Sequence, residues 1–125
     1  MNTAEKKPTE FTTRVIKAIL KIPKGKVATY KQVASLAGKE HASRAVVWIL
    51  NTCSKKYALP WQRVISSKGK IAFKINGYKF RLQRILLREE GIDVERNGDL
   101  DLKKYQYKKM ARAQNARKGT PRMFN

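Results

Sequence analysis

The sequence predicts a mainly α-helical, winged-helix-like fold that contains a helix-turn-helix and small β-hairpins. Apolar residues recur at helical spacing in four segments, and a short glycine-containing turn separates two of them. Two further sequences, Ser67-Lys68-Gly69 and Asn97-Gly98, are typical of tight turns between strands, because glycine adopts the positive φ that such turns require. A length of 125 residues and a single cysteine fit one domain without an internal disulfide.

The charge of the chain is strongly positive. Lysine and arginine total 29 residues against 9 acidic ones, which gives a net charge of +20. Such a charge favours polyanions, with nucleic acid as the first expected partner and an acidic membrane surface as the second. We expect no membrane span and no secretory signal, and therefore an intracellular protein, cytoplasmic in a prokaryote or nuclear in a eukaryote. We also expect a monomer. A single cysteine and a single histidine predict no metal site, and we expect no cofactor.

The chain divides into three parts by composition. We expect residues 1–9 to form a flexible arm, residues 10–107 to form the domain, and residues 108–125 to form a mobile basic tail. From Lys103 to the end there are eight basic residues and no acidic one, so the tail would add phosphate affinity without sequence preference. The first helix is expected over residues 10–21, where one face is apolar: Phe11, Val15, Ile16, Ile19 and Ile22.

A helix-turn-helix is expected next. Thr29 follows a short extended piece and can cap a helix over residues 30–37 through its hydroxyl. A turn that contains glycine leads to a second helix over residues 42–53, and Arg44 lies near its start, where recognition residues usually lie. Residues 54–59 are then expected to form a linker.

Two hairpins and one more helix complete the prediction. The stretch from Leu59 to Ile71 is expected to form a hairpin, in which Pro60 stiffens the chain and presents Trp61 from a defined backbone. A basic loop over residues 74–79 precedes a helix over residues 80–90. A second hairpin is expected around Asn97-Gly98, flanked by residues 92–95 and 100–102, and residues 110–118 have some helical character.

Several separated motifs occur in one order along the chain. They are Ile22-Pro23-Lys24-Gly25-Lys26-Val27, Thr29-Tyr30, Ala42-Ser43-Arg44-Ala45-Val46, Pro60-Trp61-Gln62-Arg63-Val64 and Glu89-Glu90-Gly91. With these motifs, residues 11–107 resemble the DNA-binding domain of the O6-alkylguanine-DNA alkyltransferases. They resemble more closely the alkyltransferase-like proteins, in which tryptophan replaces the reactive cysteine. The active enzymes carry Pro-Cys-His-Arg-Val where this chain has Pro60 to Val64.

The chemistry of that replacement predicts a protein that is not an alkyltransferase. Alkyl transfer needs a thiolate and a neighbouring base that activates it. Trp61 has no nucleophile, because its indole N–H is only a donor, and Gln62 cannot act as a base near neutral pH. Cys53 lies eight residues earlier and has no histidine beside it in sequence. We therefore expect no catalytic residue.

What the resemblance implies is recognition of O6-alkylguanine in duplex DNA. A helix-turn-helix would dock in the minor groove and the guanine would be flipped into a pocket. Arg44 would be the finger that fills the vacated stack, and Tyr30 would press on the target phosphate. Trp61 would form the pocket floor, the carbonyls of Trp61 and Val64 would meet the guanine amino group, and Lys74 would lie against the base. The implied DNA-binding residues are Thr29, Tyr30, Ser43, Arg44, Ala45, Val47 and Trp48. Bound lesions would be flagged for nucleotide excision repair.

Two departures from the family pattern leave an alternative open. Val47 and Trp48 stand where relatives usually carry small residues, and Gln62 stands where nearly all carry histidine or a similar residue. Together with the charge of +20, they also fit a basic architectural or RNA-associated protein that reuses the fold without a lesion pocket. A lyase or glycosylase that uses a lysine is a third and more remote reading. Arg63 is expected to support a hairpin or a neighbouring carboxylate.

Overall fold

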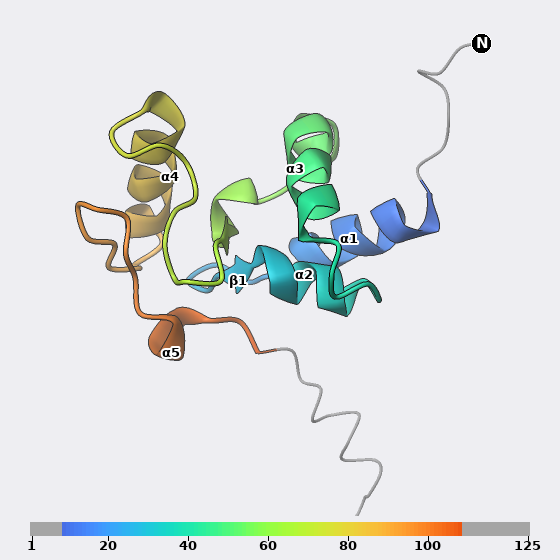
Figure 1. Cartoon of the computed structure of the whole chain (residues 1–125). Helices are drawn as coiled ribbons and strands as arrows, with labels where there is room; N and C mark the ends of the chain where they lie inside the picture. Colours follow the sequence, from blue (N-terminus) through green and yellow to red (C-terminus); the bar gives the residue numbers. More distant parts are fainter. Residues whose placement is uncertain (1–8, 109–125) are drawn as a thin grey trace, which may run out of the picture.

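The structure is a computed structural model that describes residues 9–108, and it is mainly helical as predicted (Figure 1). The elements are α1 (Glu10–Leu20), β1 (Ala28–Thr29), α2 (Tyr30–Leu36), α3 (Ser43–Tyr57), the 3-10 helix η2 (Trp61–Arg63), β2 (Val64–Ile65), α4 (Tyr78–Glu89) and α5 (Leu102–Tyr105). The predicted arm and tail lie outside the described residues except for Thr9 and Lys108. The helical character predicted for residues 110–118 also lies outside them.

The helix-turn-helix is formed by α2 and α3, which pack against each other and against α1 (Figure 1). Thr29 caps α2 as predicted: its side chain accepts a hydrogen bond from the backbone N–H of Gln32, at 2.9 Å. The Gln32 side chain accepts from the Thr29 backbone N–H in return, which completes a capping box. The cap fixes where α2 starts and so fixes the position of Tyr30, its first residue.

Helix α3 is longer than the sequence predicted. The predicted linker over residues 54–59 is wrong, because the helix continues to Tyr57 and ends at Ala58, which has a φ of 52°. Lys55 and Lys56 stabilise this last turn, since cations are favourable at a helix C-terminus. The Leu59 N–H then donates to the Ser54 carbonyl and turns the chain toward Pro60. Helix α3 is therefore about one turn longer than predicted.

Both predicted turns form, but neither leads to a regular two-stranded hairpin. The chain does fold back at each turn, since the Ser66 N–H donates to the Lys70 carbonyl at 3.0 Å and the Glu95 N–H donates to the Asp99 carbonyl at 2.9 Å. The strand β2 pairs in parallel with β1, with Ala28 opposite Val64 and Thr29 opposite Ile65. The two turns pair with each other, because Lys70 and Asp99 form an antiparallel bridge. Distant segments thus supply the pairing partners that a local pattern assigned to neighbours.

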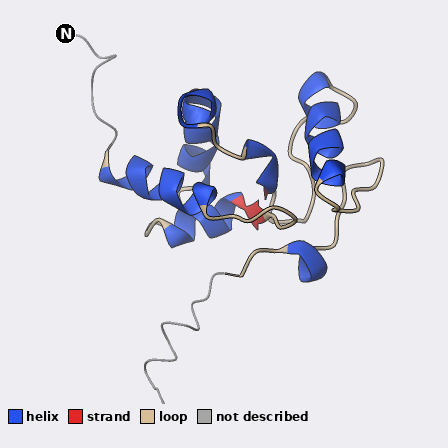
Figure 2. Ribbon diagram, turned by 180° about the vertical axis from the view of Figure 1, so that it is seen from behind, coloured by secondary structure: helices blue, strands red, loops and turns tan. Residues whose placement is uncertain are grey.

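The small sheet joins two apolar clusters. One cluster lies among α1, α2 and α3, and the other lies beneath α4 and α5. Ala28 and Val64 belong to the first cluster, whereas Val27 and Ile65 belong to the second, because successive strand residues point to opposite sides. Figure 2 shows the two short strands between the group of α1, α2 and α3 and the separate helix α4. This arrangement leaves α3 and the start of α4 on two sides of a cavity.

Candidate nucleic-acid interface

A cavity of about 470 Å³ lies between the helix-turn-helix and the start of α4. Its volume is in the range of pockets that hold small organic molecules. Its lining comes from α2, α3, η2 and the segment around α4: Tyr30, Val47, Leu50, Asn51, Ser54, Lys55, Ala58, Leu59, Trp61, Phe73 and Lys79. Two of the predicted pocket residues, Tyr30 and Trp61, are therefore brought together from positions 31 residues apart in sequence.

Trp61 is half-buried at the wall of this cavity. Its position follows from η2, where the Trp61 N–H donates to the Leu59 carbonyl at 2.8 Å. Phe73 lies edge-to-face against the indole, with ring centroids 6.1 Å apart and an angle of 80° between the planes. The ammonium of Lys79 lies 5.2 Å from the indole centroid and 5.6 Å from the Phe73 centroid. Trp61 thus presents part of an apolar ring to the cavity and has a cation held against it.

Tyr30 lines the same cavity from the first turn of α2. Burial raises the pKa of its phenol above the ordinary value. The hydroxyl therefore stays protonated across the physiological pH range and can donate a hydrogen bond. A phosphate oxygen is the kind of acceptor that such a donor would meet at a nucleic-acid surface.

A buried carboxylate holds the segment on which Trp61 stands. The Glu90 side chain is 8% exposed and lies 3.0 Å from the Arg63 guanidinium. It also accepts hydrogen bonds from the Gln62 side chain at 2.8 Å and from the Gly25 N–H at 2.9 Å. Burial acts to raise the pKa of Glu90, but the three donors and the charge of Arg63 outweigh it and lower the pKa. The predicted carboxylate partner of Arg63 is thereby confirmed, and Arg63 is not available to read a base.

Val64 is turned away from the cavity. Its side chain is buried in the first apolar cluster, and its carbonyl accepts a hydrogen bond from the fully buried Gln83 at 3.1 Å. The Trp61 carbonyl accepts from the Val64 N–H. Both carbonyls that were predicted to meet a guanine amino group are therefore already hydrogen-bonded within the chain. Each carbonyl keeps a second lone pair, which can accept another hydrogen bond.

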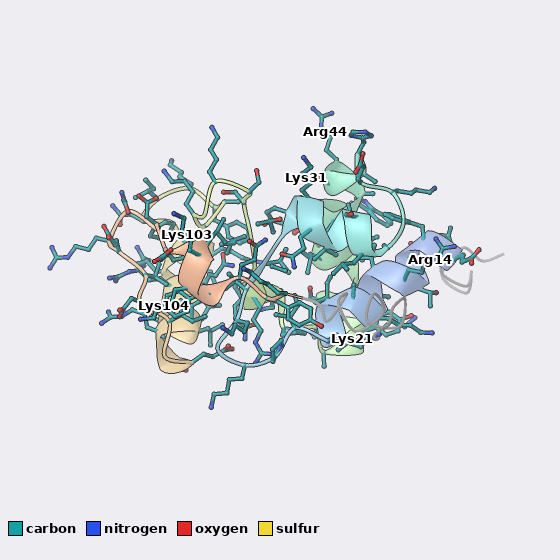
Figure 3. The ribbon with its side chains drawn as sticks, turned by 90° about the horizontal axis from the view of Figure 1, so that it is seen from below. Arg14, Lys21, Lys31, Arg44, Lys103 and Lys104 are labelled. Carbon is teal, nitrogen blue, oxygen red and sulfur yellow. The ribbon has the colours of Figure 1, made fainter. Side chains whose placement is uncertain are left out.

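The outer face of α3 carries the remaining predicted contacts. Arg44 is exposed near the start of the helix, and Figure 3 shows it on the same side of the molecule as Lys31 of α2. Val47 is 39% exposed and Trp48 is 63% exposed, so both stand on the surface and not in the core. Ser43 and Ala45 are partly exposed beside them, whereas Thr29 is buried in β1, where its hydroxyl caps α2. The face is thus basic at one end and apolar further along.

Sequence reasoning did not find several of the cavity residues. Lys74 was predicted to lie against the base, but it is exposed in the loop before α4 and is not among the lining residues. Lys79 and Phe73 line the cavity instead. Asn51, Ser54 and Ala58 follow Val47 at helical spacing, and this signal would have been readable only with the full length of α3 known.

Charge around the cavity has one sign. Lys55 and Lys79 are the ionisable cations in its lining, and no acidic side chain of residues 9–108 lines it. Within the same residues, no group of three or more histidine, cysteine, aspartate or glutamate side chains is placed to hold a metal ion. None of the helices in this described part is both long and apolar enough to span a bilayer.

The chain is similar to a known family of DNA-binding domains. Residues 10–92 match the family described as 6-O-methylguanine DNA methyltransferase, DNA binding domain. The chain belongs to this family. Among its relatives is a DNA base-flipping protein of Vibrio parahaemolyticus, 39% identical over 98 residues, which cover 78% of this chain and 96% of the relative. Alkyltransferase-like protein 1 of Schizosaccharomyces pombe is 32% identical over 103 residues, which cover 79% of this chain and 95% of the relative.

A solved structure within this family also superposes well. The S. pombe protein Atl1, in complex with damaged DNA that contains O6-carboxymethylguanine, matches with a TM-score of 0.71 and 32% identity. The match covers 82% of this chain and 99% of Atl1. The helix-turn-helix of this chain is therefore that of the 6-O-methylguanine DNA methyltransferase DNA-binding domains.

Proposed function

We propose that this protein recognises DNA damage without catalysing a reaction, by binding O6-alkylguanine in duplex DNA with the base flipped into the cavity beside Trp61. The observation that carries the proposal is the cavity itself. An indole stands where the active enzymes carry a cysteine, and beside it is a space of about 470 Å³ that is lined by Tyr30. Support also comes from relatives that are named for base flipping and for likeness to alkyltransferases.

Docking begins with charge. A net charge of +20 attracts the DNA backbone, and α3 would then enter the minor groove with Arg44 leading. Extruding a guanine costs a few kcal/mol, least for a base whose pairing is already weakened by alkylation. The Arg44 guanidinium would fill the vacated stack, since its planar group can stack between base pairs. The Tyr30 hydroxyl would donate a hydrogen bond to the phosphate of the rotated nucleotide.

Once flipped, the base meets the aromatic wall of the cavity. Stacking of a base on an aromatic side chain contributes about 1–3 kcal/mol, which is enough to offset much of the flipping cost. The O6-alkyl group would lie against the apolar surface of Trp61 and the neighbouring lining residues. Because Trp61 offers no nucleophile and Gln62 no base, the lesion would remain intact in the complex.

A binding comparison at matched salt tests this function. Fluorescence anisotropy would measure the affinity for two duplexes that differ only in one guanine or O6-methylguanine. We expect the modified duplex to bind more tightly, and we expect Trp61→Ala and Arg44→Ala each to reduce this discrimination by about 1–3 kcal/mol. Trp61→Phe and Arg44→Lys are the matched variants, because they keep an aromatic ring and a charge. Equal affinity of the native protein for the two duplexes would refute lesion recognition.

The absence of catalysis has its own test. The protein would be incubated with a duplex whose O6-methyl group is isotopically labelled, and its intact mass would be measured. We expect no gain of a methyl group, because Cys53, the single cysteine, lies in α3 and is not among the lining residues of the cavity. Stoichiometric methylation of the protein would contradict the proposal.

We further propose that the bound lesion is flagged for nucleotide excision repair. A flipped base held in a cavity leaves the duplex distorted and covered by a basic protein. This complex would be a larger structure for repair factors to recognise than a methyl group alone. Co-sedimentation of excision-repair proteins with the complex on modified DNA, but not with the complex of the Trp61→Ala variant, would support this role. Equal recruitment by both would count against it.

One observation favours a second candidate function. Val47 and Trp48 are exposed on α3, where bulky groups hold the helix away from the sugar edges or wedge into the groove. A basic architectural or RNA-associated protein would use this face with the charge of +20. Its binding would fall steeply with salt, and Trp61→Ala would change it little. The anisotropy comparison above separates the two functions.

A further inference from the structure

We propose that Lys79 and Lys55 make the cavity select guanines whose O6-substituent carries a negative charge over neutral substituents of the same size. This inference rests on the proposed function, since it concerns what the same cavity admits. Both lysines line the cavity, and no acidic side chain of the described residues lines it with them. The occupant therefore meets positive charge and no negative charge there.

The position of Lys79 is held by two aromatic rings. Its ammonium lies 5.2 Å from the centroid of Trp61 and 5.6 Å from that of Phe73. The rings are edge-to-face, so the cation sits against two π systems at once. Cation–π attraction lowers the freedom of the long side chain before any ligand binds. The charge is thus placed beforehand beside the indole on which a base would stack, and little ordering remains for the ligand to impose.

Tertiary structure brings Lys55 to the same cavity from the other side. Lys55 belongs to the last turn of α3 and Lys79 to the first turn of α4, so the two charges come from different helices. The side-chain ion pairs found among residues 9–108 use Arg14, His41, Arg63 and Lys70, and neither of these two lysines. Their charges are accordingly not neutralised by a carboxylate within ion-pair distance in that part of the chain.

A carboxylate carried on O6 is the substituent that this arrangement fits. Within the cavity the carboxylate would lose part of its hydration shell and would interact instead with one or two lysine ammonium groups, each of which is a point charge on a flexible side chain. A carboxamide of the same shape lacks the charge and so gains only hydrogen bonds. Because Lys79 is exposed, the total gain is expected to be about two- to fivefold in affinity, the range of a solvent-exposed charge pair.

Four duplexes of one sequence test the inference. They carry guanine, O6-methylguanine, O6-carboxymethylguanine or the neutral carboxamide analogue of the last, and they are compared at low and at physiological salt. The readout is the ratio of affinities for the carboxymethyl and carboxamide duplexes. We expect a ratio of about two to five for the native protein at low salt, and a smaller ratio at higher salt.

Variants test which lysines produce the ratio of affinities for the carboxymethyl and carboxamide duplexes. Lys79→Gln is expected to bring the ratio toward one, Lys79→Arg to keep it, and Lys79→Gln with Lys55→Gln to abolish it. Lys68→Gln is the matched control, because it removes one exposed lysine in the turn before Lys70, outside the cavity lining. If Lys79 acts on the phosphate backbone, its loss weakens all four duplexes by the same factor and leaves the ratio unchanged, which overturns the inference.

The failure of the inference differs from the failure of the proposed function. A protein that binds every O6-substituted duplex more tightly than the unmodified one, but binds the carboxymethyl and carboxamide duplexes equally, has the function without the charge selection. A protein that does not distinguish any of the substituted duplexes from guanine lacks the function itself.

Discussion

The carboxylate of Glu90 joins three segments that are far apart in sequence, and its neutralisation is the sharpest test of how Trp61 is held. Glu90 lies at the end of α4, where it accepts from Arg63 and Gln62 of η2 and from Gly25 after α1. Arg63 in turn donates to the Ile22 carbonyl at 2.8 Å. We predict that Glu90→Gln weakens all three attachments, because an amide keeps the shape but loses the charge and one acceptor.

The expected loss of stability follows from burial. The side chain of Glu90 is 8% exposed and that of Arg63 is 18% exposed, so water replaces little of the lost interaction. Breaking one partner of a fully buried ion pair costs about 3–5 kcal/mol, and partial access to water reduces that figure. We therefore expect Glu90→Gln to lower the free energy of unfolding by about 2–4 kcal/mol at neutral pH.

The pH dependence provides a second signature. The pKa of Glu90 is lowered in the folded protein, so this carboxylate contributes stability that is present above the ordinary carboxyl pKa. The contribution is lost as the pH falls through the lowered pKa, because the folded state must then take up a proton against its donors. The difference in stability between the native protein and Glu90→Gln should accordingly narrow as the pH falls below about 4.

Urea unfolding, followed by tryptophan fluorescence and circular dichroism at several pH values, measures both effects. Glu89→Gln is the matched control, because the neighbouring side chain is exposed at the same helix end. We expect the control to change stability by less than about 0.5 kcal/mol. Two outcomes would refute the reasoning: equal stability of the Glu90 and Glu89 variants, or a loss for Glu90→Gln that is the same at every pH.

Three further predictions concern the close packing of a turn, the helix cap and the basic tail. Gly98→Ala should destabilise the protein by about 3 kcal/mol in urea unfolding, because its φ is 92° and an added Cβ would lie 2.8 Å from the Phe80 ring. Gly91→Ala should cost only about 1 kcal/mol, since its φ is 89° but no atom lies within 4 Å of the added Cβ, and equal losses would contradict this account. Thr29→Ala should lower stability by about 1 kcal/mol in thermal unfolding while Thr29→Ser does not, and a neutral alanine variant would show that the capping box contributes nothing. Deletion of residues 109–125 should make the binding of undamaged DNA less dependent on salt, and an unchanged slope of log K against log salt would exclude the tail from phosphate contact.

Local sequence patterns predicted the helices because apolar spacing and capping residues act within a few residues of one another. The apolar spacing of α1 and the hydroxyl of Thr29 act within a few residues, so both are readable without a fold. The end of α3 was not predicted, because its last turn is polar and ends at an alanine with positive φ instead of a glycine. The strand pairing was wrong for a related reason: turn residues indicate where the chain reverses, but not which segment a strand pairs with.

Some features of the candidate site could likewise be predicted from the sequence, and others could not. The replacement of a cysteine by Trp61, and of a histidine by Gln62, could be read from the order of motifs in the sequence alone, as could the expectation that Arg44 starts the recognition helix. The resemblance implied a pocket at Trp61 and a carboxylate near Arg63, but the residues that line the cavity, the identity of that carboxylate as Glu90 and the position of Lys79 over two rings could not be read from the sequence.

The sequence of this protein therefore determined its family and its charge, and it predicted that the reactive cysteine and its histidine are absent. Those properties depend on which residues are present and in what order. The shape and charge of the space beside Trp61 depend on side chains that approach from α2, α3, η2 and α4. Contacts between such distant segments are set by how the two apolar clusters pack on the parallel strand pair. Local sequence patterns do not predict that packing, because it depends on residues that are far apart in the chain.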